Sequence, residues 1–168
     1  MSHTTNISAL QNQLAESRAN LMAALEGLNE ADLIDKTAVG VWSVKDSIGH
    51  IIDWEKRMLD AVRHIQDPVA YPPVQPVSPD TDNEDEWNDK LVANRESQSW
   101  AETLQDLSET RKSVHQFMGQ LSAADLAKTG ACPWPDDTMT IAGLLGFMAE
   151  HDDDHIPVLE AWRAEKVG

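Results

Sequence analysis

The sequence predicts an all-α protein, an antiparallel up-down-up-down four-helix bundle with a long proline-rich connection between helices 2 and 3. Apolar residues repeat at helical spacing in several segments, Ser or Thr caps precede two of these segments, and alternating apolar runs typical of strands are absent. A length of 168 residues fits one domain, residues 1–168. The expected helices cover residues 5–28, 43–66, 86–121 and 140–162.

The first two helices are predicted from an apolar face and from a cap. In the first, leucines recur at spacings of four, seven, four and three, which places them on one face: Leu10, Leu14, Leu21, Leu25 and Leu28. The second begins at Ser43, because the Ser43-x-x-Asp46 pattern resembles a capping box. It is expected to end near Gln66.

Five prolines rule out a helix in the connection 67–85: Pro68, Pro72, Pro73, Pro76 and Pro79. A third helix is expected after it. Thr140 is placed to cap the fourth helix, which continues toward Trp162. Pro157 should kink or break that helix, because it denies an N–H to the carbonyl of Asp153.

The composition excludes several functional classes. Asp and Glu number 29 against 13 Lys and Arg, a formal charge of -16, which would repel the phosphate backbone of a nucleic acid. The single cysteine, Cys132, excludes an internal disulfide and a Cys-rich metal motif. The sequence shows neither a cationic start followed by an apolar stretch nor a run of about 18 apolar residues. We therefore expect a soluble, cytoplasmic protein without nucleic-acid or membrane partners.

Each predicted helix has one polar interruption in its inward stripe. The interruptions are Arg18 with its neighbour Ser17, Glu55, Arg111, and the pair His151 and His155. With a rise of about 1.5 Å per residue, they fall at similar depths in the bundle. Buried charges and imidazoles are costly unless they are paired or coordinated, so this layer indicates a site.

The histidines are candidate metal ligands. His151 and His155 are four residues apart, which places both imidazoles on one helix face. His50 on the second helix could supply a third nitrogen, and three protein ligands leave a coordination position open, as in catalytic zinc sites. The alternative is that the histidines form a hydrogen-bonded layer in the core.

A sequence pattern near the second helix is similar to that of a known family. The pattern Trp42-Ser43-Val44-Lys45-Asp46-x-x-Gly49-His50-Ile51-x-x-Trp54-Glu55, joined to His151-x-x-x-His155, resembles the DinB-like metal-binding four-helix proteins. The resemblance implies one divalent ion, zinc or nickel, on His50, His151 and His155. The family includes thiol-dependent S-transferases and isomerases, proteins assigned as metal-dependent hydrolases, and self-protection proteins that act on a reactive natural product.

The leading hypothesis is a metal-dependent enzyme acting on a small molecule, with the ion activating water, a thiol or a substrate group. Glu55 could serve as a general base and Arg111 could bind a substrate carboxylate, or the two could form a structural ion pair. A low-molecular-weight thiol is a possible second substrate, and dimerisation through an exposed helix face is open. The alternative function is a non-catalytic protein that sequesters a metal or a metabolite.

Overall fold

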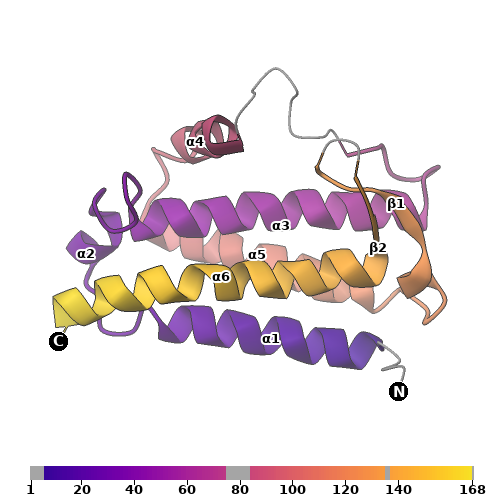
Figure 1. Ribbon diagram of the computed structural model, residues 1–168, viewed down its shortest axis with the longest axis horizontal. Coiled ribbons are helices and arrows are strands. Elements are labelled where there is room, and N and C mark those ends of the chain that lie inside the picture. The colour runs from indigo at the N-terminus through magenta and orange to yellow at the C-terminus, as the bar shows by residue number, and fades with distance from the viewer. Residues whose placement is uncertain (1–5, 75–83, 135–136, 168) are drawn as a thin grey trace.

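The computed structural model describes residues 6–74, 84–134 and 137–167. Four long helices lie side by side along its longest axis (Figure 1). They are α1 (Ile7–Ala23), α3 (Val44–Gln66), α5 (Trp100–Met118) and α6 (Ile141–Val167). The shorter elements are α2 (Glu30–Ile34), α4 (Glu84–Asn94), the 3-10 helix η1 (Asp125–Ala127), and the strands β1 (Thr129–Ala131) and β2 (Thr138–Thr140).

The fold is mostly helical, as predicted, but it is not purely so. The strands β1 and β2 pair antiparallel, with Thr129 opposite Thr140 and Ala131 opposite Thr138. Each strand has only three residues, which is too short for an alternating apolar pattern to appear in the sequence. The hairpin closes the end of the molecule at which α3 ends and α6 begins (Figure 1).

The predicted up-down-up-down order of directions is wrong. The end of α6 meets the chain just after α1, where Arg163 Nε donates to the carbonyl of Glu26 at 2.5 Å, so α1 and α6 run parallel. Helices α3 and α5 also run parallel, and Lys56 on α3 pairs with Asp106 on α5 at 2.6 Å. The physical reason is that the chain enters α5 beside the start of α3, where Lys45 Nζ donates to the carbonyls of Glu96 and Gln98.

The single helix predicted over 86–121 is two helices, α4 and α5. A complete capping box starts the second one: Ser99 accepts from the N–H of Glu102, and the Glu102 carboxylate accepts from the N–H of Ser99. The turn before it is held to α3 by Arg95, which pairs with Asp53 at 2.5 Å. The start of α5 thus has a local signal in the sequence, and the contact of Arg95 with Asp53 fixes where the turn before it lies.

Other boundaries also differ from the prediction. Helix α1 ends at Ala23, and Gly27 has φ +86°, a left-handed conformation suited to glycine. The connection after α3 has no helix or strand over 67–74, while 75–83 lie outside the described residues. Helix α6 runs through Pro157 without a break. Pro157 and Asp153 are both exposed, so water can satisfy the carbonyl that loses its donor.

The apolar core has two parts with a polar layer between them. One cluster, toward the hairpin, includes residues from all four long helices: Leu14, Met58, Val114 and Met148. The other lies toward the opposite end: Leu21, Ile51, Leu107 and Leu159. On each helix, one residue of the polar layer lies between these pairs: Arg18, Glu55, Arg111 and Asp152. None of the described helices combines the length and apolar content that a membrane crossing requires.

The cap of α3 gives the fold a testable pH dependence. Burial raises the pKa of Asp46, but hydrogen bonds from Lys36 and Ser43 outweigh it, and the pKa lies below its ordinary value. Folded Asp46 therefore releases its proton more readily than unfolded Asp46. This stabilisation is complete well above pH about 4 and is lost as the pH falls further.

We expect Asp46→Asn to destabilise the protein by about 1 kcal/mol at pH 7, because it removes a charged cap. In urea unfolding measured from pH 7 to pH 3, the difference from the wild type should be constant down to about pH 5 and then shrink. A difference that stays constant to pH 3 would contradict the assignment of Asp46.

Candidate metal centre

Three histidines from two antiparallel helices converge through their Nε2 atoms. His50 lies in the second turn of α3, and His151 and His155 lie one turn apart on α6. The Nε2 atom of His151 is 3.1 Å from that of His50 and 3.3 Å from that of His155. Each ring offers one ligand atom, and all three atoms lie within 4.8 Å of one another. The structure thus brings together the three histidines that the sequence singled out.

These separations suit a bound metal ion. Zinc lies about 2.0–2.1 Å from imidazole nitrogens, so two nitrogens in a tetrahedral shell are about 3.3 Å apart. The two short Nε2 separations, 3.1 and 3.3 Å, are close to this value. His50 is buried, while His151 and His155 are partly exposed, so the triad is reached from one side of α6.

The triad is built from neutral imidazoles. Burial, assisted by the neighbouring histidines, lowers the pKa of His50 to about 2 and that of His151 to about 4. Burial also lowers the pKa of His155. All three rings are therefore in the form that coordinates metals at neutral pH. The Nδ1 atom of His50 is buried without a hydrogen-bond partner among the described residues, so the polar contact of this ring is at Nε2.

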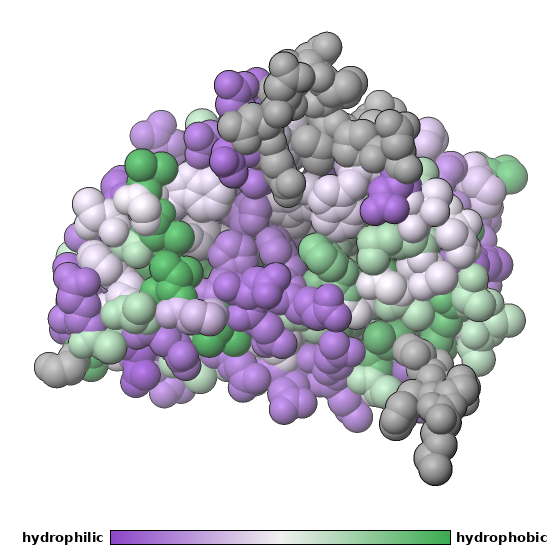
Figure 2. Space-filling model, viewed as in Figure 1, coloured by the Kyte–Doolittle hydropathy of each residue, from purple (hydrophilic) through white to green (hydrophobic). Residues whose placement is uncertain are grey.

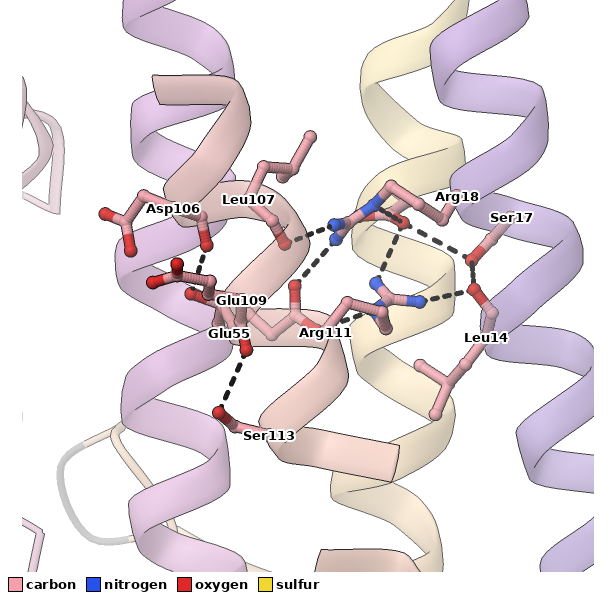
Figure 3. Close-up of polar contacts among 11 residues, drawn as sticks. Leu14, Ser17, Arg18, Glu55, Asp106, Leu107, Glu109, Arg111 and Ser113 are labelled. Atoms are coloured by element: carbon pink, nitrogen blue, oxygen red, sulfur yellow. Dashed lines mark hydrogen bonds and ion pairs between the residues drawn. The ribbon is translucent and has the colours of Figure 1, made fainter. Parts of the chain in front are cut away.

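Beside the triad, a buried charge network connects all four long helices (Figure 3). Arg18 on α1 pairs with Glu55 at 2.6 Å and with Asp152 at 2.9 Å. Arg111 on α5 pairs with the same two carboxylates at 2.6 and 2.9 Å, and it also donates to the carbonyl of Leu14. Both acids lie on the helices that carry the histidines, and both arginines lie on the other two. The arginines therefore bridge the ligand helices.

The predicted polar layer is confirmed for three of the four long helices; on α6 the residue that joins it is Asp152, beside the predicted His151. Arg18, Glu55 and Arg111 meet, as their similar depths indicated. Of the two alternatives for Glu55 and Arg111, the ion pair is present in the structure; a catalytic role for either stays a prediction.

One member of the network, Asp152, is not among the residues that the sequence analysis places in the polar layer. Asp152 is completely buried. The helical spacing of the sequence does place Asp152 on the inward face of α6, because it lies four residues after Met148 and seven before Leu159, both of which face the core.

Solved structures similar to this chain share its fold over almost their whole length. DfsB, described as a sibling lethal factor precursor, is 14% identical with a TM-score of 0.79, and the match covers 96% of this chain and 97% of DfsB. YfiT from Bacillus subtilis, described as a probable metal-dependent hydrolase with an unusual four-helix bundle topology, is 16% identical with a TM-score of 0.72, covering 95% and 87%. An uncharacterised protein from Clostridium difficile 630 is 11% identical with a TM-score of 0.74, covering 95% and 96%.

A search of the curated proteins finds no match. The family model described as the DinB superfamily matches residues 13–159, which include all three histidines and the whole charge network. Because this match covers most of the chain, the protein belongs to the DinB superfamily.

Proposed function

We propose that this chain is a metal-dependent enzyme that acts on a small molecule. The observation that carries the proposal is the convergence of the His50, His151 and His155 Nε2 atoms at separations that suit one divalent ion. Zinc and nickel are the candidates, since imidazole nitrogen is a good ligand for both. The description of YfiT as a probable metal-dependent hydrolase supports the same class for this chain.

When bound, the ion would supply a Lewis acid that polarises a substrate group or activates water or a thiol, as a hydrolase or a thiol-dependent S-transferase requires. The protein's part is to hold three neutral imidazoles in place and leave one side open. The partly exposed rings of His151 and His155 provide that side. The buried His50 ring fixes the position of the site against α3.

For Glu55 and Arg111 we propose a supporting role. Each oxygen of the Glu55 carboxylate accepts from a guanidinium, at 2.6 Å in both cases. Both oxygens of Glu55 are therefore engaged in the network. Arg111 is likewise held by Glu55, by Asp152 and by a backbone carbonyl. Both residues are suited to keeping the ligand helices together.

The pairing of Glu55 also favours a second candidate function, a protein that sequesters a metal or a metabolite without turnover. Such a protein needs the three histidines but no general base. The two functions differ in product formation, because only the first converts a bound small molecule.

Metal analysis tests the proposal directly. Protein purified without an affinity tag should contain, or take up on titration, one equivalent of zinc or nickel. The loaded protein should then turn over members of a panel of ester, amide and electrophilic substrates, the last with and without added thiol. Absence of stoichiometric metal uptake would refute the proposal. Uptake without turnover of any substrate would favour sequestration.

A further inference from the structure

Aromatic rings form a closed circuit of contacts that includes two of the three histidines. From His50 the circuit passes to Trp54 on α3, Trp134 between the strands, Phe147 on α6, and His151. The successive ring centroids are 6.3, 5.3, 5.0 and 6.2 Å apart, and His151 and His50 close the circuit at 5.0 Å. Ring contacts of this length are attractive in stacked and edge-on geometries. The aromatic rings of tryptophan and phenylalanine therefore border the triad.

The indole groups offer mainly ring surface, because helix α4 occupies the polar atoms of two of them. Trp42, whose ring centroid is 5.3 Å from that of His50, donates its Nε1–H to Asp89 at 2.9 Å. Trp54 donates its Nε1–H to the buried Asn88, also at 2.9 Å. The indole N–H is the only hydrogen-bonding group of tryptophan. A ligand beside these two rings would meet apolar surface.

Several of these rings are accessible. Trp54 is fully buried, as a core tryptophan is, whereas Trp42, Trp134 and Phe147 are partly exposed, like His151 and His155. Trp134 and Phe147 pack edge to face, and Phe147 stacks on His151 with an interplanar angle of 13°. The partly exposed rings of Trp134, Phe147 and His151 thus lie in a row, each beside the next.

The charges near the triad disfavour anions. Figure 2 shows a hydrophilic patch in the middle of the face that α6 presents. The exposed residues of α6 next to the ligands are all acidic: Glu150, Asp153 and Asp154. The two arginines of the network are already paired with Glu55 and Asp152. An anionic group would thus meet exposed carboxylates and paired cations.

From these observations we infer the substrate class of the site, an inference that rests on the proposed function. The substrate is an uncharged or cationic small molecule with an aromatic or other flat unsaturated group. This group packs against Trp134 and Phe147 while its reactive group lies at the histidines. Trp134 and Phe147 are the residues that determine specificity.

A matched pair of metal-binding probes tests the inference by affinity alone. Acetohydroxamic acid and benzohydroxamic acid carry the same uncharged chelating group and differ in a methyl against a phenyl group. By calorimetry on the zinc-loaded protein, benzohydroxamic acid should bind about tenfold more tightly, because its phenyl group adds aromatic contacts that the methyl group cannot make. 4-Carboxybenzohydroxamic acid should bind several-fold more weakly than benzohydroxamic acid.

Substitutions identify the residues that produce the preference for the phenyl probe. Trp134→Ala and, as a milder change, Phe147→Leu should each reduce the preference for the phenyl probe, and the affinity for acetohydroxamic acid should stay within about twofold. Trp100→Ala is the matched control, because Trp100 is also partly buried but packs in the other core cluster. It should leave the preference unchanged.

The outcomes separate the two proposals. If no metal is taken up, neither probe binds and the proposed function fails. If acetohydroxamic acid binds and the phenyl probe binds no better, the metal site stands and the substrate class is overturned. Tighter binding of the carboxylated probe would overturn the inference about charge. Loss of the preference in Trp100→Ala as well would remove Trp134 and Phe147 as its source.

Discussion

Asp152→Ala is expected to lower the free energy of unfolding by about 3–5 kcal/mol, the cost of breaking one side of a buried ion-pair network. The Asp152 carboxylate is completely buried and accepts from Arg18, Arg111 and Ser17. Its removal leaves two guanidinium groups with only Glu55 as a counter-charge. For a domain of this size the melting temperature should fall by about 6–20 °C. Differential scanning calorimetry measures this directly.

The adjacent carboxylate provides the control. Asp153 is exposed. Its pKa is raised by the slight desolvation of its carboxylate and by the negative charges of Asp152, Asp154 and Glu16, so its own charge is unfavourable where it lies. Asp153→Ala should change stability by no more than about 0.5 kcal/mol, with slight stabilisation expected. Equal losses in the two variants would mean that the network does not carry the stability we assign to it.

A second comparison separates charge from packing. Replacing the whole network with apolar residues, as in R18M/E55M/R111M/D152L, removes all of its charges together, so that no charge is left unpaired. Such replacements of buried ion pairs are often neutral or stabilising. This variant should therefore be more stable than Asp152→Ala, although it carries more substitutions. If it is less stable, the loss in Asp152→Ala reflects packing.

His151→Ala should reduce the affinity for zinc by more than about 100-fold. Changes in the residues around metal ligands already cost about 10- to 100-fold, and His151 is a ligand itself. It is also the central member of the triad, since its Nε2 atom is 3.1 Å from that of His50 and 3.3 Å from that of His155. Competition with a chromophoric chelator, on untagged protein, gives the affinity.

Another histidine serves as the matched control for this substitution. His115 is partly buried on α5 and belongs to no group of potential metal ligands among the described residues. His115→Ala should bind zinc like the wild type. If His151→Ala keeps the zinc affinity of the wild type but lowers the melting temperature, the histidines are a structural layer. If both variants lose zinc equally, the site lies elsewhere.

The sequence was a good guide where a local pattern decides the outcome. The Ser43 and Asp46 box at the start of α3 and the Thr140 cap, whose hydroxyl accepts from Gly143 at 2.9 Å, both follow from short-range rules. The inward position of His151 and His155 also follows from helical spacing. These features depend on residues within one or two turns of each other.

What the sequence did not provide is the path of the chain between helices. The Ser99 and Glu102 capping box marks the start of α5 locally, but the turn before it is held to α3 by Arg95 reaching Asp53, 42 residues away. Without that break, alternating directions were the natural assumption, and His50 and His155 then lay about 12 Å apart in depth. In the structure α3 and α6 run in opposite directions, so that estimate, which assumed parallel helices starting level, does not apply.

The parallel packing of α1 and α6 has a consequence for biosynthesis. Helix α1 packs chiefly on α6, which begins only at Ile141, and α6 also carries two of the three histidines. A nascent chain that has not yet released α6 from the ribosome thus has neither the main partner of α1 nor a complete set of ligands. The leucine face of α1 then stays exposed to solvent, and exposed apolar faces promote aggregation. Closure of the core and assembly of the three histidines both await the emergence of α6 from the ribosome.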